Sequence, residues 1–287
     1  MGKQAYTAAQ MVLGVPLTEH DTISAMFGID SNQIFAWRGS SPQSIVDYID
    51  VIGQRTFHAW RGEVSWARDT RNDFLQPSRG TLQRVSAEVS LPGSTAEFYK
   101  FNYEFSRYWP ISRALVLNTR LELGYGASYG DPRYATVYDP DSPEDTDDLP
   151  EAREAVADGL PFFENFYAGG ARSVRGFRDN TLGPRESAWN SSYMQVIGGA
   201  VKTVGSLEMF FPTLFDSPAA RISAFVDFGN VFKDVDAFDA NELRASAGVA
   251  LMWRAPVGPI SISYAYPLRK QEGDEIERLQ FTFGGAF

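Results

Sequence analysis

The chain has 287 residues, of which 44% are hydrophobic, 14% aromatic and 22% charged, and it contains no cysteine. This composition excludes a disordered chain, a disulfide scaffold and a cysteine-ligated metal centre. With 36 acidic and 26 basic residues the net charge is −10, so we expect no nucleic-acid partner. The first residues lack the continuous apolar run of a signal peptide, and no stretch reaches the roughly 18 apolar residues of a membrane helix. A soluble all-β protein and a membrane β-barrel remain, because barrel strands are apolar only at alternate residues.

Apolar and polar residues alternate with period two through most of the sequence. Within residues 114–125, Leu121 and Leu123 fall on one face of an extended chain while Arg120 and Glu122 fall on the other, whereas a helix would mix these residues. Similar alternation predicts eleven strands, near residues 5–15, 21–30, 56–68, 80–91, 96–109, 113–126, 193–211, 220–232, 243–255, 259–269 and 276–287. Outside these strands, residues 150–157 are the one candidate helix.

The connections between the predicted strands are of two kinds. Most are short and rich in Pro or Gly, as at 92–95 and 212–219, whereas those at 31–55 and 127–192 are long. Long loops at one end and short turns at the other favour a transmembrane barrel with the long loops outside the cell. The connection at 69–79 is long for a turn on the opposite side, and 92–95 is short for an outer loop.

Aromatic residues towards the strand ends support the membrane interpretation, since their rings suit the headgroup level. They are Trp60, Trp66, Tyr108, Trp109, Trp253, Tyr264 and Tyr266. A soluble sandwich would also have an aromatic core, but it would have to cover eleven strands with two packed faces. We therefore expect an all-β, antiparallel transmembrane β-barrel.

Two unusual segments lie within the longest connection. Residues 139–158 contain nine acidic residues and one basic residue. Oxygen ligands suit Ca²⁺, but the spacing matches no EF-hand loop, so we expect a solvated loop segment and no metal. Residues 161–185 combine glycines and aromatics with Arg172, Arg175 and Arg178, which predicts a loop that packs against something and is not simply exposed.

The second segment carries a specific resemblance. Residues 166–184 (FYAGGARSVRGFRDNTLGP) closely resemble the sixth extracellular loop of the BamA family, the central barrels of the outer-membrane β-barrel assembly machinery. Val174, Arg175, Gly176 and Phe177 match the family's VRGF motif. Residues 206–213, 225–232, 245–268 and 279–287 match in order, so the resemblance covers nearly the whole chain. It implies a location in the outer membrane of a Gram-negative bacterium and a role in the insertion of β-barrel proteins.

The resemblance also implies partners for the arginine of the motif. In this family the loop folds back into the barrel lumen, where the arginine meets acidic residues of the following strands; here these are Glu208 and Asp227. The alternation agrees, because Asp227 faces away from Val226 and Phe228. An arginine fork suits carboxylates in a two-point pairing, and a buried guanidinium needs such partners. Bracing of the loop is the simplest role for this trio, and a direct role in assembly is the alternative.

The last strand is predicted to form a lateral seam. In the family this strand closes loosely on the first strand, and the seam offers its edge to incoming strands. Gly284 and Gly285 would weaken the strand end, or simply bend it, and the terminal aromatic Phe287 resembles the signal that marks outer-membrane proteins for insertion. The expected partners are unfolded outer-membrane protein clients, outer-membrane lipids, and the assembly lipoproteins and POTRA domains, the last two outside this chain.

The family barrel has sixteen strands, and the eleven predicted here align with the last eleven. We therefore expect residues 1–287 to be a C-terminal barrel portion, with the first five strands and the POTRA domains outside it; either the chain is a fragment or another chain supplies the remaining strands. The alternative function is a translocation pore or assembly barrel of the two-partner-secretion or translocation-assembly type. We expect no enzyme and no cofactor, because neither His20 nor His58 lies in a nucleophile or metal-ligand context.

Overall fold

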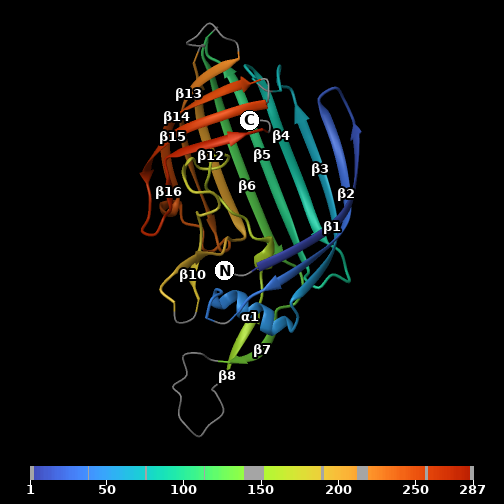
Figure 1. The fold of residues 1–287 in the computed structure, drawn as a ribbon. Coiled ribbons are helices and arrows are strands. Elements are labelled where there is room, and N and C mark those ends of the chain that lie inside the picture. Colours follow the sequence, from blue (N-terminus) through green and yellow to red (C-terminus); the bar gives the residue numbers. More distant parts are fainter. Residues whose placement is uncertain are drawn as a thin grey trace.

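A curved antiparallel sheet of eleven strands dominates the computed structural model, which describes residues 3–37, 39–74, 76–112, 114–138, 152–188, 191–211, 219–255 and 258–284. Figure 1 shows the strands as one wall, from the blue N-terminal strands to the orange and red C-terminal strands. In spatial order the strands are β1 (Lys3–Pro16), β2 (Asp21–Phe35), β3 (Thr56–Asp69), β4 (Gly80–Ser90), β5 (Phe98–Pro110), β6 (Val116–Ser128), β12 (Val201–Phe210), β13 (Ala220–Phe232), β14 (Arg244–Ala255), β15 (Gly258–Arg269) and β17 (Leu279–Phe283). Among the described residues β1 and β17 each pair with one neighbour, so the sheet is open.

Shorter elements occupy the connections at one end of the wall and along its concave face. They are α1 (Gln43–Ile52), β7 (Arg133–Tyr138), β8 (Ala152–Ala157), the 3-10 helices η1 (Phe162–Glu164) and η2 (Ala240–Glu242), β9 (Gly176–Phe177), β10 (Arg185–Ser187), β11 (Met194–Val196) and β16 (Ile276–Glu277). β7 pairs with β8, β10 with β11, and β9 with β16. No helix in the described part of the chain is long and apolar enough to cross a membrane.

The side chains of the sheet alternate between an apolar outer face and a polar inner face. On β13, Val226 is 41% exposed on the convex side while Phe225 and Asp227 are buried on the concave side. On β17, Leu279 and Phe281 point outward on either side of the buried Gln280. Because no second sheet covers the outer face in the described ranges, a soluble sandwich is excluded, and the predicted all-β wall of a barrel is confirmed.

The eleven predicted strands are confirmed, with two shortened. The segment predicted as one strand at 193–211 divides into β11 and β12, and Gly198, whose φ is +71°, lies in the break. The last predicted strand divides at Arg278, since β16 pairs with the loop strand β9 whereas β17 pairs with β15. Both divisions occur where a strand leaves the sheet to bind the loop on the concave face.

Two local predictions are wrong. Residues 152–157 of the candidate helix form strand β8, because β7 supplies a hairpin partner and Ala155 and Ala157 are buried on the side of α1. Helix α1 lies within the connection at 31–55, for which no helix was expected. It buries Val46 and Ile49, and it ends at Gly53, whose N–H donates to the carbonyl of Ile49 in the left-handed conformation that glycine favours.

Candidate functional site

We call the described residues between β8 and β12 (158–188 and 191–200) the inner loop, and its part from Leu160 to Leu182 lies against the concave face of the sheet (Figure 1). Its apolar core residues are fully or nearly buried and pack on β12 and β13; they are Ala168, Val174, Phe177 and Leu182, together with Val204 and Val231 of the strands. Backbone hydrogen bonds between Phe166 and Gly199 close the base of the loop. The inner loop therefore lies on the concave, luminal side of the sheet, as the resemblance implies.

Arg175 at the tip of this loop binds both of its predicted partners. Its Nε and Nη2 donate to the two carboxylate oxygens of Asp227 over 2.7 and 2.8 Å, a two-point pairing, and its backbone N–H also donates to Asp227 over 3.1 Å. Nη1 and Nη2 lie 3.2 and 3.3 Å from the carboxylate oxygens of Glu208. Hydroxyl groups of Ser206 and Ser223 donate to Asp227 and Glu208 respectively, so each carboxylate has a second partner.

Burial makes this cluster strongly interdependent. Arg175 and Glu208 are each 7% exposed and Asp227 is fully buried. The guanidinium carbon of Arg175 also lies 3.3 Å from the ring centroid of Phe225, a cation–π contact. Burial alone would lower the pKa of Arg175, but its hydrogen bond to Asp227 and the charges of Glu208 and Asp227 outweigh burial, so the pKa lies above its usual value. The cluster therefore holds one cation between two anions away from solvent.

Glycine at position 176 is required by the close approach of the motif to the wall. Its φ is +90°, and a Cβ at this residue would lie 3.0 Å from the Cβ of Ala265 on β15. The backbone of the motif then meets β17. The N–H of Gly176 donates to Gln280 Oε1 over 3.2 Å, and Gln280 Nε2 donates to the carbonyl of Phe177 over 2.7 Å. Val174 and Phe177, both fully buried, fill the space on either side.

A second charged cluster, which the sequence did not predict, binds the first part of the inner loop to the other half of the sheet. Arg61 of β3 forms ion pairs with Asp30 of β2, Glu88 of β4 and Glu164 of η1; the distance to Glu88 is 2.6 Å. Lys100 of β5 lies 3.3 Å from Glu164. Arg61 and Glu164 are 103 residues apart, so no local spacing could have indicated the pair.

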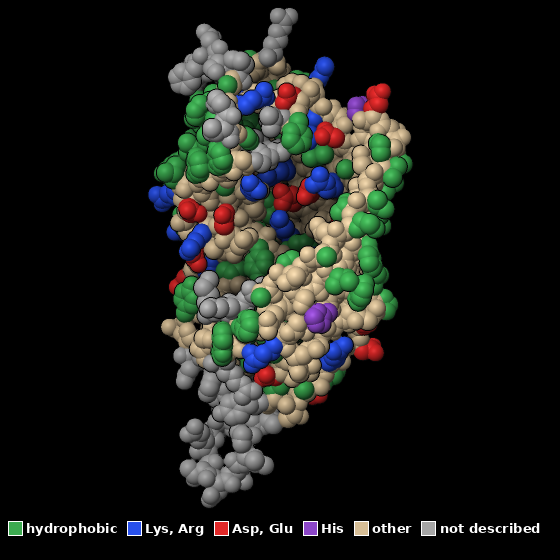
Figure 2. Space-filling model, turned by 45° about the vertical axis from the view of Figure 1, so that its right-hand side comes forward, with side chains coloured by type: hydrophobic (Ala, Val, Ile, Leu, Met, Phe, Trp, Pro, Cys, Tyr) green, Lys and Arg blue, Asp and Glu red, His purple; other side chains and the backbone are tan. Residues whose placement is uncertain are grey.

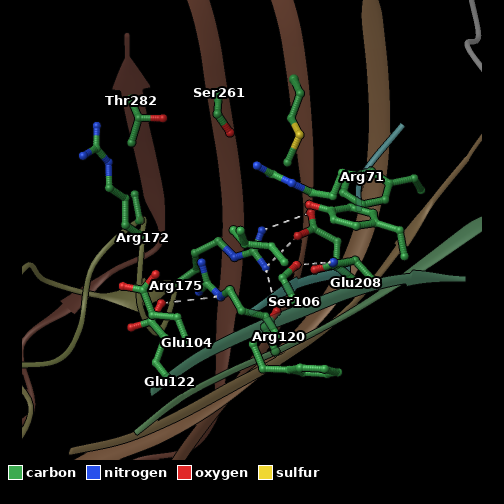
Figure 3. A pocket seen from close by; sticks show the side chains of 18 of the residues that line it. Arg71, Glu104, Ser106, Arg120, Glu122, Arg172, Arg175, Glu208, Ser261 and Thr282 are labelled. Atoms are coloured by element: carbon green, nitrogen blue, oxygen red, sulfur yellow. Dashed lines mark hydrogen bonds and ion pairs between the residues drawn. The ribbon is translucent and has the colours of Figure 1, made fainter. Parts of the chain in front are cut away.

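A cavity of about 390 Å³ lies beside the Arg175 cluster, between the tip of the inner loop and the sheet. Figure 3 shows Arg175 directed toward Glu208 and Arg120 toward Glu122 there, with Ser261 and Thr282 on the strands above them in this view. In Figure 2 basic and acidic side chains gather in a hollow of the molecule, whereas hydrophobic side chains gather along its right-hand edge and at its upper left. The lumen is therefore polar, as in a barrel that faces lipid outside and water inside.

The remaining predicted residues have mixed outcomes. Gly284 adopts φ +71° directly after β17, so it ends the strand, and its carbonyl accepts a hydrogen bond from Arg172 over 3.3 Å. Gly285 and Phe287 lie outside the described residues, as does most of the acidic segment, including 139–151. His20 and His58 are both exposed, and no cluster of metal-ligating side chains occurs in the described part of the chain.

Of the seven aromatics predicted near strand ends, Trp60, Trp109, Trp253, Tyr264 and Tyr266 are exposed on the sheet. Trp66 is half-buried. Tyr108 is the exception, because it is only 8% exposed and stacks on Phe210 inside the lumen. The ring at residue 108 thus packs the interior and is no candidate for the headgroup level.

Known proteins share this architecture. The chain is 32% identical to the outer membrane protein assembly factor BamA of Neisseria meningitidis serogroup B, over 99% of the chain and 36% of that protein. The crystal structure of BamA from Haemophilus ducreyi lacking POTRA domains 1–3 superimposes with a TM-score of 0.81 at 26% identity, covering 98% of this chain and 54% of that one. CdiB from Escherichia coli shares the fold at 14% identity, with a TM-score of 0.55, over 98% of this chain and 44% of that one.

The chain spans about a third of the length of the meningococcal relative and about half of the Haemophilus chain. Its resemblance to the BamA family is confirmed by these similarities, which run through the whole sheet and the inner loop. The profile of the Omp85 superfamily domain matches residues 3–287, and the chain therefore belongs to the Omp85 superfamily.

Proposed function

We propose that this chain forms the C-terminal wall of a barrel that assembles and inserts β-barrel proteins into the bacterial outer membrane, and that its last strand offers the working edge. The observation that carries the proposal is the state of β17. In the described residues this strand pairs with β15 through five residues only, while its luminal face is bound to the inner loop. A strand with so short a ladder is easily displaced, and a displaced strand edge is a template for an incoming strand.

The length of β17 supports the same role. It has 5 residues, whereas its neighbour β15 has 12. A strand needs roughly 9–11 residues to cross a bilayer, so β17 spans only part of the apolar layer. Lipid beside this edge must thin or reorganise, which lowers the barrier for a client strand that enters there.

The named relatives agree with this assignment. The meningococcal protein is called an outer membrane protein assembly factor, and the chain, as a member of that family, is an outer-membrane protein of a Gram-negative bacterium. The eleven strands would be the C-terminal part of a larger barrel. Its partners would be unfolded outer-membrane proteins, lipids, and the lipoproteins and POTRA domains of an assembly machinery. We propose no bond chemistry, because strand pairing and lipid exposure suffice to drive insertion.

The absence of cysteine in the chain makes the proposal directly testable by cross-linking. A single cysteine is placed in the protein as its cell produces it, either at the seam (Phe281→Cys) or on a central lipid-facing strand (Val226→Cys). During folding of a client barrel that carries cysteines in its terminal strand, Phe281→Cys should give disulfide-linked client and Val226→Cys should not. Equal cross-linking at both positions would contradict the seam.

The translocation pore predicted as the alternative is distinguished by function in a reconstituted membrane. An assembly barrel accelerates the folding of a client into vesicles of defined lipid. A pore gives a steady single-channel conductance in a planar bilayer and leaves client folding unchanged. The cavity beside Arg175 is lined by paired charges, including Glu208, which suits a braced lumen.

A further inference from the structure

The side chain of Gln280 makes two hydrogen bonds between β17 and the backbone of the arginine motif. We propose that Gln280 is a positioning residue that latches the seam strand to the inner loop, so that β17 cannot move from its place without breaking its hydrogen bonds to the backbone of the motif. The proposal rests on the proposed function and deepens it, because it assigns a residue that couples the working edge to the loop.

The latch needs a hydrogen-bond acceptor and a donor side by side, which a primary amide supplies. Gln280 accepts from the N–H of Gly176 and donates to the carbonyl of Phe177, the residue directly after it. A carboxamide presents an acceptor and a donor in one plane, as a peptide group does, and it keeps both at any pH. The amide thereby continues the short β9–β16 ladder, in which Phe177 pairs with Ile276 and Gly176 with Glu277.

Both hydrogen bonds of Gln280 are shielded from water. The residue is 5% exposed, and Phe177 is fully buried. If the side chain withdrew, the amide of Gly176 and the carbonyl of Phe177 would remain buried without their partner, which costs more than an exchange with water. Loss of the two bonds corresponds to a roughly five- to hundredfold fall in the ratio of seated to released loop.

Two further hydrogen bonds join the inner loop to the residues that flank β17. The N–H of Arg178 donates to the carbonyl of Glu275 over 2.9 Å, and Arg172 donates to the carbonyl of Gly284 over 3.3 Å. These lie before and after β17, so the loop binds the strand near its start, through Gln280, and near its end. In contrast, the Arg175 cluster binds β12 and β13, and it would stay intact if β17 alone moved.

The test uses the protein as its cell produces it, with spin labels on Arg178→Cys and Glu275→Cys, two exposed residues whose backbones touch beside the latch. Dipolar broadening in continuous-wave EPR reports whether the loop and the segment that leads through β16 into β17 stay together. Gln280→Leu, which keeps the size but removes the amide, should lose most of the broadening. Undiminished broadening in Gln280→Leu would overturn the latch.

Gln280→Glu supplies a readout that a purely structural role would not move. A protonated carboxyl has an acceptor and an O–H donor and reproduces the amide, whereas an ionised carboxylate has only acceptors and faces the carbonyl of Phe177. The broadening should therefore be present at pH below the pKa of the introduced carboxyl and be lost reversibly above it. The parent protein and Gln280→Leu, measured over the same range, account for the titration of the other charged residues of this region, Glu277, Arg278, Arg172 and Arg175, which lie in β16, at the β16–β17 break and in the loop.

A pH-independent spectrum in Gln280→Glu would overturn the latch even if Gln280→Leu failed to fold. Because EPR requires no client, the latch is tested whether or not the protein inserts barrels. Client folding into vesicles, measured on the same samples, then tests the coupling. It should slow in Gln280→Leu and recover at low pH in Gln280→Glu relative to the parent. If the loop is released while client folding keeps its rate, the latch exists but does not serve assembly.

Discussion

Removal of the Arg175 guanidinium is the perturbation that tests the site most directly. In Arg175→Met the long apolar stem remains, but Asp227, which is fully buried, and Glu208, which is 7% exposed, lose their shared cation. Removing one partner of a buried ion pair costs about 3–5 kcal/mol, because the other charge stays buried without compensation. We expect a loss of that size in the free energy of unfolding, and a larger one for Arg175→Glu, which adds a third anion.

The matched control lies three residues further along the same loop. Arg178 is also paired with a carboxylate, that of Glu275, but it is exposed to solvent, so Arg178→Met should leave stability unchanged within error. Urea unfolding in lipid vesicles gives the free energy. Limited trypsinolysis reports the loop itself, since Arg172 and Arg178 flank the tip and become cleavable when it is released.

A rescue separates charge from packing. In Arg175→Met with Asp227→Asn one of the unpaired anions is removed, and the two changes should therefore be coupled by roughly 0.5–3 kcal/mol. The reasoning is refuted if Arg175→Met is as stable as Arg178→Met and as resistant to trypsin as the parent protein. It is also refuted if the double variant is no more stable than the sum of the two single changes predicts.

Three further changes have expected outcomes. Arg61→Met should loosen the start of the inner loop at a cost of about 3–5 kcal/mol, because Asp30 and Glu88 lose their cation and Glu164 keeps only Lys100. Hydrogen exchange at η1 should rise, and unchanged exchange would contradict this. Gly176→Ala should destabilise by about 1–3 kcal/mol, since φ is +90° and the new methyl group would lie 3.0 Å from Ala265; a urea midpoint equal to the parent's would exclude this close approach. Val226→Arg places a charge in mid-strand on the lipid face and should make the free energy of folding into vesicles less favourable by about 2–4 kcal/mol. A folding titration measures this loss, with Val226→Leu as the control. Similar titrations for the two variants would argue that this face does not meet lipid.

The strands could be predicted because the solvent differs on the two faces of the sheet. Lipid favours Leu121 and Leu123 on one side, and the lumen favours Arg120 and Glu122 on the other. The alternation of apolar and polar residues is therefore visible within each short stretch of the sequence. Asp227 and Glu208 fell on the correct face for the same reason. Their pairing with Arg175 came from the resemblance of the loop motif, because alternation gives a direction but no partner.

The missed features depend on residues far apart in the chain. Gln280 alternates with Leu279 and Phe281, which is typical of a residue on the inner face, but its partners are backbone groups more than 100 residues earlier. Backbone groups leave no mark on residue type. Helix α1 was a different kind of miss, because a local signal existed: Val46 and Ile49 are three residues apart and Gly53 follows the last turn, which is typical of an amphipathic helix and its end.

The arrangement of these anchors bears on how an open wall keeps its curvature. The inner loop is bound at β3 through Arg61, at β12 and β13 through Arg175, and at β17 through Gln280. A barrel wall has no thick apolar core to fix its radius, since its outer face meets lipid and its inner face is polar. The two ionic anchors fix the loop across the middle of the sheet with buried charges, which release only at a high cost. The anchor at the seam uses two neutral hydrogen bonds instead, and it is therefore the one that an incoming strand could displace.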